Sequence, residues 1–213
     1  FAAFLSSQIG SRMDVLARYV REVKNSGTQV LPPDVNESGA SFSAVGNVIR
    51  FGLKAVAKAG ESAVESMIKA RESKGAFKSL WDFLNKVDLR AVNRGVIENL
   101  IKSGSFNSLH PNRRQLLENL PMLVERVQKK QNDGAQRSLL ALVEELPQEE
   151  PVLGECEDYS LVEKLDLEKQ VLGLFISGHP LEREEQRLSR FTTCRISDLA
   201  FWKAAESTAT VGG

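Results

Sequence analysis

The sequence predicts a mainly α-helical protein, because helical periodicity continues almost unbroken from residue 53 to about residue 130. Apolar residues make up 42% of the 213 residues, enough for a sizeable core. A second observation is a pattern that occurs twice, in which two apolar residues one helical turn apart precede a cation and a glycine. The copies are Leu53, Val56, Lys58, Gly60 and Ile97, Leu100, Lys102, Gly104. Each predicts a helix, a tight turn and a second helix, so the pattern indicates a tandem helix-hairpin-helix.

The segments before the repeat are predicted in order. Residues 1–26 have one apolar and one basic stripe, which predicts a single helix ended by Gly27. Residues 28–31 are extended, and residues 32–39 form a turn-rich loop in which Asp34 and Asn36 are more consistent with shaping the loop than with touching a ligand. Residues 42–45 and 48–51, joined by a Gly46-Asn47 turn, predict a small β-hairpin.

The two copies are separated and followed by segments of different character. Residues 80–87 contain a dense apolar turn around Trp81, which we expect to be buried in the core rather than to stack on a base. Residues 131–160 are acidic and rich in Gln and Pro, which predicts a flexible linker with one apolar island. Residues 160–176 are amphipathic and predict a helix, and residues 188–213 are weakly patterned.

Charge is distributed unevenly although the chain has 28 basic and 28 acidic side chains. Residues 45–130 carry 16 basic and 8 acidic side chains, whereas residues 131–213 carry 8 basic and 16 acidic ones. The repeat therefore lies in a basic block, which is typical of a module that attracts polyanions.

A helix-hairpin-helix in a basic block predicts binding to backbone phosphates, because a tight turn leaves free N–H groups at a positive helix N-terminus. Such contacts do not read bases, so we expect binding to be independent of sequence. The expected DNA-binding residues are Lys58, Gly60, Glu61, Ser62, Lys102, Gly104, Ser105, Arg113 and Arg114. The alternative left open by the motif is an ordinary helical domain with glycine C-caps.

Several classes of protein are disfavoured by what the sequence lacks. Cys156 and Cys194 are isolated, which indicates neither disulfides nor zinc and favours the reducing cytoplasm. No apolar run reaches the roughly 18 to 20 residues that span a bilayer, so no membrane partner is expected. No paired-aspartate, HExxH or glycine-rich nucleotide motif occurs, so the sequence predicts no catalytic residue, metal site or cofactor within this chain.

Four strings occur in order along the chain: Leu31 to Ser38, Ile49 to Val56, Val92 to Phe106 and Leu172 to Leu181. Together they closely resemble the alpha subunit of bacterial DNA polymerase III, the C-family replicative polymerase. The resemblance covers nearly the whole chain.

The resemblance implies four regions. Residues 1–44 are the C-terminal part of the fingers domain, residues 45–130 the tandem helix-hairpin-helix DNA-binding domain, residues 131–160 the acidic linker, and residues 161–213 a helix and a connection toward a missing OB-fold. The implied role is to grip the double-stranded primer-template DNA. The metal-binding aspartates of the family's palm lie upstream, so we expect this fragment to be inactive, the full-length polymerase to use Mg²⁺, and other polymerase III holoenzyme subunits to be partners.

The family also has an internal sliding-clamp motif after this domain, of the form Gln-x-Ser/Asp-Leu-Phe. The corresponding residues here are Gln136, Ser138, Leu139 and Leu140, with Arg137 at the variable position. Leu140 replaces the aromatic anchor, and such anchors often carry much of the binding energy of a short peptide. The motif predicts clamp binding, and the alternative is a plain linker.

Two other functions are considered. The basic block can be a helical protein-interaction scaffold in a replication or repair assembly without direct DNA contact. DNA binding and scaffold binding differ in how their affinity depends on salt concentration. A repair nuclease or glycosylase is disfavoured, because it leaves the four strings unexplained.

Overall fold

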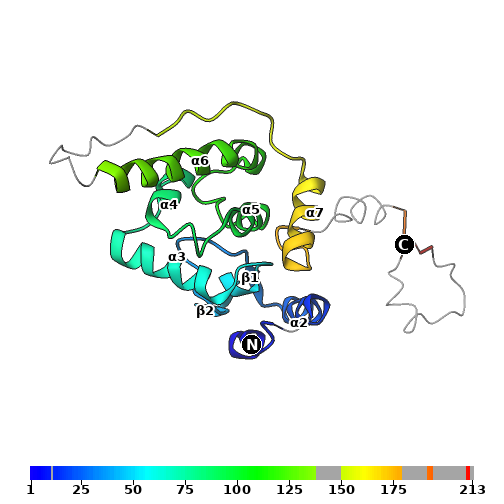
Figure 1. Cartoon of the computed structure of the whole chain (residues 1–213). Helices are drawn as coiled ribbons and strands as arrows, with labels where there is room; N and C mark the ends of the chain where they lie inside the picture. Colours follow the sequence, from blue (N-terminus) through cyan, green and yellow to red (C-terminus); the bar gives the residue numbers. More distant parts are fainter. Residues whose placement is uncertain (11, 138–149, 179–190, 194–209, 212–213) are drawn as a thin grey trace, which may run out of the picture. The chain divides into compact units, whose positions relative to one another are not determined.

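The computed structural model describes residues 1–10, 12–137, 150–178, 191–193 and 210–211. Residues 1–176 form one compact unit and residues 177–213 a second one. The first unit confirms the prediction of a mainly α-helical fold with a small β-hairpin (Figure 1). Its helices are α1 (Ala2–Ser7), α2 (Met13–Asn25), the 3₁₀ turn η1 (Leu53–Ala55), α3 (Glu61–Lys74), α4 (Leu80–Lys86), α5 (Arg94–Lys102), α6 (Arg113–Arg137) and α7 (Leu161–Leu172). In the second unit, the amide of Thr193 donates to the carbonyl of Thr210.

The N-terminal region has two helices where one was predicted. The break between α1 and α2 includes Gly10, whose φ of 92° is a left-handed conformation that glycine adopts at little cost. The helix α2 ends before Gly27, which has a φ of 83° and acts as the predicted terminator.

A three-stranded sheet connects this region to the repeat. The strands β1 (Gln29–Leu31), β2 (Ser43–Val45) and β3 (Val48–Arg50) lie in the order β1-β3-β2. The strands β2 and β3 form the predicted hairpin, and β1 adds to β3 in parallel, with Val30 opposite Ile49. The expected boundary between residues 44 and 45 cuts through β2. The sheet belongs to the same folded unit as the repeat, residues 1–176.

The loop at Asp34 has the structural role that the sequence favoured. The Asp34 carboxylate accepts hydrogen bonds from the amides of Asn36 and Glu37, at 2.7 and 3.1 Å. The Asn36 side chain pairs with the backbone of Phe77 through two hydrogen bonds of 2.8 and 2.9 Å. Both side chains therefore hold the loop and the start of the α4 region together.

The core lies between the two copies of the repeat, as the apolar turn predicted. Trp81 is only 8% exposed, and Phe83 is fully buried. Phe83 makes edge-on contacts with Phe77 and Phe106, with ring centroids 4.8 and 5.0 Å apart. Since α4 and α5 both pack against α6 (Figure 1), these rings join the turn after α3 to the turn after α5.

The predicted linker of residues 131–160 differs from the structure at both ends. The helix α6 continues to Arg137, seven residues beyond the expected boundary. From residue 150 the chain runs over α6 to α7 (Figure 1), and the amide of Gly154 donates to the Asn119 side chain at 3.2 Å. The Asn112 side chain donates to the carbonyl of Cys156 at 2.7 Å. Residues 154–160 are thus a packed part of the fold, although their composition is that of a linker.

Candidate nucleic-acid interface

The first copy of the repeat forms a turn that we define as residues 56–62, the first turn. Leu53 and Val56 are buried as predicted, but residues 53–55 make only one 3₁₀ turn, so the first helix of this hairpin is not a full α-helix. Lys58 has a φ of 66°, a left-handed conformation that is uncommon for a residue with a Cβ atom. Gly60 is the N-cap of α3, which begins at Glu61.

The N-terminus of α3 is open. Gly60 supplies no side-chain cap, and a Cβ atom built on it would meet no atom within 4 Å. Gly60 therefore offers no side-chain acceptor to the first N–H groups of the helix, those of Glu61 and Ser62, and leaves open space beside the backbone. Because α3 is 14 residues long, its positive end also attracts negative charge.

Two lysines and one carboxylate surround this opening. Lys54 forms an ion pair with Glu61, and the hydrogen bond from Lys54 together with its charge lowers the pKa of the Glu61 carboxyl. A hollow of about 320 Å³ adjoins them; it is lined by residues 54–60 and by Gly10, Met13 and Leu16. The ammonium of Lys58 lies 4.0 Å from the position that a Cβ atom would take on Gly95 in α5. Lys54 and Lys58 thus both line this hollow.

The second copy, whose turn we define as residues 102–114, the second turn, has a different backbone. Lys102 is the last residue of α5, and Gly104, not Lys102, takes the left-handed conformation with a φ of 81°. The ammonium of Lys102 donates to the Gln170 side chain in α7 at 3.3 Å. Ser105 is fully buried, and its hydroxyl lies 2.7 Å from that of Ser103. The side chain of Ser105 is therefore not offered to a phosphate.

Arg113 is also inside the protein, contrary to the expectation that it adds surface charge. Its side chain is 2% exposed, and its guanidinium pairs with Glu168 of α7 at 2.9 Å. The same group donates to the carbonyl of Lys102 at 3.0 Å and to the Asn107 side chain at 3.1 Å. Arg113 fixes the second turn against α6 and α7, because its charge and hydrogen bonds are taken up by these partners.

The start of α6 is occupied, unlike the start of α3. The Asn112 side chain accepts a hydrogen bond from the amide of Gln115 at 2.9 Å, which caps the helix. The amide of Arg114 donates to the Asp158 carboxylate at 3.4 Å. The Arg114 side chain is about half exposed and pairs with Glu118 at 2.8 Å, one helical turn further on.

Hydrogen bonds join the first turn to α5, which leads into the second turn, and to α7. The Asn99 side chain in α5 donates to the carbonyl of Ala57 at 2.7 Å, and the amide of Ala57 donates to the carbonyl of Val171 in α7 at 2.9 Å. Lys58 lies beside Gly95 and Lys102 lies seven residues further along α5, about 10 Å at 1.5 Å per residue.

The residues of the expected clamp motif are only partly described. Gln136 lies in the last turn of α6. Ser138, Leu139 and Leu140 lie outside the described residues.

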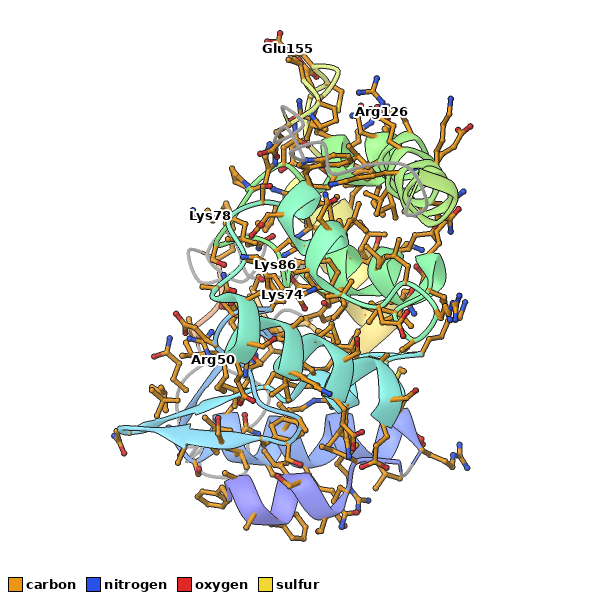
Figure 2. All side chains as sticks on the ribbon, turned by 60° about the vertical axis from the view of Figure 1, so that its left-hand side comes forward. Arg50, Lys74, Lys78, Lys86, Arg126 and Glu155 are labelled. Atoms are coloured by element: carbon orange, nitrogen blue, oxygen red, sulfur yellow. The ribbon has the colours of Figure 1, made fainter. Side chains whose placement is uncertain are left out.

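Lys54 was not among the residues predicted from the sequence. A signal existed, since Lys54 precedes Lys58 by four residues, but the sequence could not show that the chain folds both around one hollow. Figure 2 shows a second group of cations, Lys74, Lys78 and Lys86, near the end of α3. Lys86 donates to the carbonyls of Gly75 and Ala76, and Lys74 to that of Lys86, so these two lysines hold the α3–α4 connection.

Some kinds of site are absent from the described part of the chain. No group of three or more His, Cys, Asp or Glu side chains there is placed to hold a metal ion. Within the same residues, no helix is long and apolar enough to cross a lipid bilayer.

The tandem turns around one core, with an open helix N-terminus at Gly60, define a helix-hairpin-helix protein, and a family model described as "Helix-hairpin-helix motif" matches residues 27–116. The chain is 40% identical over 202 residues to DNA polymerase III subunit alpha of Deinococcus radiodurans and 36% identical over 200 residues to that of Thermus aquaticus. The same subunit of Mycobacterium tuberculosis H37Rv is 39% identical over 190 residues. The chain is therefore homologous to a segment of the DNA polymerase III alpha subunits, as the four sequence strings indicated.

The matches include 92%, 94% and 85% of this chain, respectively, but only 15%, 16% and 16% of those relatives. The chain thus spans about one sixth of the length of the curated relatives it matches.

Proposed function

We propose that the first turn binds backbone phosphates of double-stranded DNA without reading the base sequence. The observation that carries this proposal is the uncapped N-terminus of α3 at Gly60, with Lys54 and Lys58 at the same opening. Backbone N–H groups and lysine ammonium groups are the donors that bind phosphate oxygens, and neither kind touches base edges. On the second turn, only Lys102 and Arg114 remain as exposed or partly exposed cations for the same strand.

A phosphate that binds Lys54 at this site must compete with the carboxylate of Glu61. This carboxylate lies at the first position of α3 and pairs with Lys54, so an approaching phosphate competes with it for that lysine. Glu61 is 69% exposed, and its side chain is free to turn toward solvent while its N–H group stays at the helix N-terminus. We therefore expect Lys54 to exchange Glu61 for a phosphate when DNA binds.

We place this grip within a longer DNA-directed DNA polymerase, because the homologous subunits carry that name. In this proposal the chain holds primer-template DNA, and residues outside it perform nucleotidyl transfer with Mg²⁺. The chain alone is expected to be inactive, and other holoenzyme subunits are expected partners.

The test is fluorescence anisotropy of the whole chain with a labelled random-sequence duplex over a salt series. Lys58→Glu is expected to weaken binding about tenfold at low salt and to lower the log–log salt slope by about one. Lys69→Glu is the matched control, because it makes the same charge change at an exposed position further along α3. Equal effects of the two variants would show that only net charge matters and would contradict a phosphate site at the first turn.

The same series separates DNA binding from the protein-interaction scaffold. Phosphate binding gives a steep, linear fall of log affinity with log salt, because each neutralised phosphate releases a counterion. A scaffold without DNA contact gives no duplex binding even at low salt.

Sliding-clamp binding by Gln136, Ser138, Leu139 and Leu140 stays a prediction from sequence. Its support is the Gln-x-Ser-Leu pattern, and its weakness is Leu140 in place of an aromatic anchor. We expect Leu140→Phe to strengthen binding of the chain to an immobilised bacterial clamp and Gln136→Ala to abolish it. No binding by the wild-type chain or by Leu140→Phe would leave this segment as a linker only.

A further inference from the structure

The start of α6 is covered by a segment of the chain itself, residues 154–160, which we name the acidic segment. It contains Glu155, Glu157 and Asp158 and no Lys or Arg. Its backbone is held by side chains of α6 and its N-cap: Gln115 donates to the carbonyl of Gly154 at 2.9 Å, and Asn112 to that of Cys156 at 2.7 Å. Glu155 is exposed and lies at the outer edge of the molecule in Figure 2. Of the three carboxylates, Asp158 contacts the start of α6, through the amide of Arg114.

The Asp158 carboxylate lies between the two kinds of donor that bind a phosphate. One oxygen accepts from the amide of Arg114 at 3.4 Å, which is a first-turn N–H group of α6, and also from the amide of Tyr159 at 2.8 Å. The other oxygen pairs with the ammonium of Lys164 in α7. At the first turn, a helix N-terminus beside a lysine has no side-chain cap. At the second turn, the Asp158 carboxylate occupies the same kind of arrangement.

The charge of Asp158 is maintained at neutral pH. Partial burial raises the pKa of its carboxyl, but hydrogen bonds from Lys164 and from the amides of Tyr159 and Arg114 outweigh that effect, so the pKa lies below its ordinary value. The group is thus an anion near neutral pH, as a phosphate is.

We propose that Asp158 occupies a latent phosphate site made by the amide of Arg114 and the ammonium of Lys164, and that the acidic segment competes with duplex DNA for the second turn. This inference rests on the proposed DNA binding at the first turn, since the same duplex would extend from one turn to the other. The DNA-binding surface then has one phosphate site at an uncapped helix N-terminus and one that opens when the segment moves.

Displacement of the segment is feasible because polar contacts hold most of it. Asp158 and Lys164 are 24% and 27% exposed, so an incoming phosphate can reach the pair from solvent. Hydrogen bonds from the Arg114 amide and the Lys164 ammonium to Asp158 are replaced by hydrogen bonds to the phosphate, so these two donors stay paired. Since the segment is tethered to α7, it also returns readily when DNA leaves.

The test compares Asp158→Asn with the wild-type chain in the same anisotropy series. We expect Asp158→Asn to bind the duplex about three- to tenfold more tightly at low salt, because the carboxylate that competes with the phosphate is gone. Asp166→Asn is the control, since it removes one exposed carboxylate from α7 outside the segment. Equal behaviour of the two variants would overturn the inference.

The outcome also separates the inference from the proposed function. If wild type binds in a Lys58-dependent manner but Asp158→Asn does not differ from Asp166→Asn, only the latent site is excluded. If neither wild type nor Asp158→Asn binds, both proposals fail.

Hydrogen exchange on the wild-type chain tests the same inference without a substitution. Saturating duplex is expected to speed exchange at the amides of residues 154–160, whose contacts with α6 are broken, and to slow it at Glu61 and Ser62. Unchanged or slower exchange in the acidic segment would contradict displacement.

Discussion

Two adjacent arginines in α6 show how differently the fold uses the same side chain. Arg113 is 2% exposed and pairs with a fully buried carboxylate, Glu168, whose second oxygen accepts from the amide of Ile176. Arg114 points outward and pairs with Glu118, and both side chains are about half exposed. The first pair is desolvated and fixed by several hydrogen bonds, whereas water screens the second.

Replacing Arg113 with Ala is expected to destabilise the protein by about 3–5 kcal/mol, because the buried Glu168 carboxylate loses its guanidinium partner. Arg114→Ala is the neighbouring control and is expected to cause little measurable loss. The double variant Arg113→Met/Glu168→Leu is expected to regain most of the lost stability, since it removes both charges. Urea unfolding of the three variants measures these differences. Equal losses in Arg113→Ala and Arg114→Ala would contradict the buried pair.

Substitution by glycine is expected to affect stability differently at Lys58 and Lys102, the two lysines of the repeat. Lys58 is in the left-handed region, where a side chain costs about 1–2 kcal/mol, so Lys58→Gly is expected to leave stability unchanged or to raise it by up to about 1 kcal/mol. Lys102 ends a regular helix, so Lys102→Gly is expected to lower stability by about 1 kcal/mol. Thermal unfolding compares them.

Duplex binding by the same two variants separates charge from backbone conformation. Lys58→Gly is expected to bind DNA more weakly although it is no less stable. If Lys58→Gly is both destabilised and unaltered in DNA binding, Lys58 has a structural role instead.

The sequence predicted which residues repeat but not how each one is used. Lys58 and Lys102 occupy matching positions, and nothing in the pattern shows that only Lys58 takes a positive φ. Arg113 was expected at the surface because its partner Glu168 lies 55 residues away in α7, and local periodicity carries no information about such a pairing. Trp81 was placed correctly, because burial at helical spacing among apolar neighbours is a local property.

Gly60 and Gly104, the glycines of the two turns, lack a side chain for different reasons. Gly60 has an ordinary φ of −65° and open space around it, so its lack of a side chain serves close approach to the backbone rather than the turn itself. Gly104 has a φ of 81°, and a Cβ atom there would overlap the Arg113 guanidinium.

We expect Gly104→Ala to lose more than about 1–2 kcal/mol, since the left-handed penalty adds to displacement of Arg113 from Glu168. Gly60→Ala is expected to change stability by less than about 1 kcal/mol but to weaken duplex binding. Chemical unfolding and anisotropy on both variants give the comparison. A strongly destabilised Gly60→Ala would show that the first turn needs glycine for folding and would weaken its assignment to DNA.

Among the elements, the helices of the repeat were predicted more closely than the connection after them. The periodicity of α5 is strong, and Ser160 with Glu163 makes the capping box that begins α7. Residues 154–160 were predicted to be a mobile linker because they are polar and contain many acidic residues. Their contacts run through backbone carbonyls to Asn112 and Gln115, and composition does not encode backbone contacts.

The folded unit as a whole is larger than the basic block that defines the repeat. The strand β1 pairs in parallel with β3, and the amide of Val35 donates to the carbonyl of Ser105, so residues before position 45 complete the sheet and support the second turn. At the other end, Val171 bonds to Ala57 and Glu168 pairs with Arg113. These long-range pairings could not be read from local patterns, and they move the boundaries of the unit outward on both sides.

The unit boundaries predict how fragments behave. Residues 1–176 contain the contacts described above that hold both turns, so this fragment is expected to unfold cooperatively at nearly the same temperature as the whole chain. Residues 45–130 lack β1, the Asp34 loop and α7, which leaves Arg113 without its buried carboxylate and β3 without a neighbour, so this fragment is expected not to fold. Circular dichroism melts and the dispersion of amide resonances compare the two. A cooperative transition in residues 45–130 would show that the basic block folds alone and that α7 and β1 are not required for its fold. In that case the buried Arg113–Glu168 pair would not be needed to form the second turn.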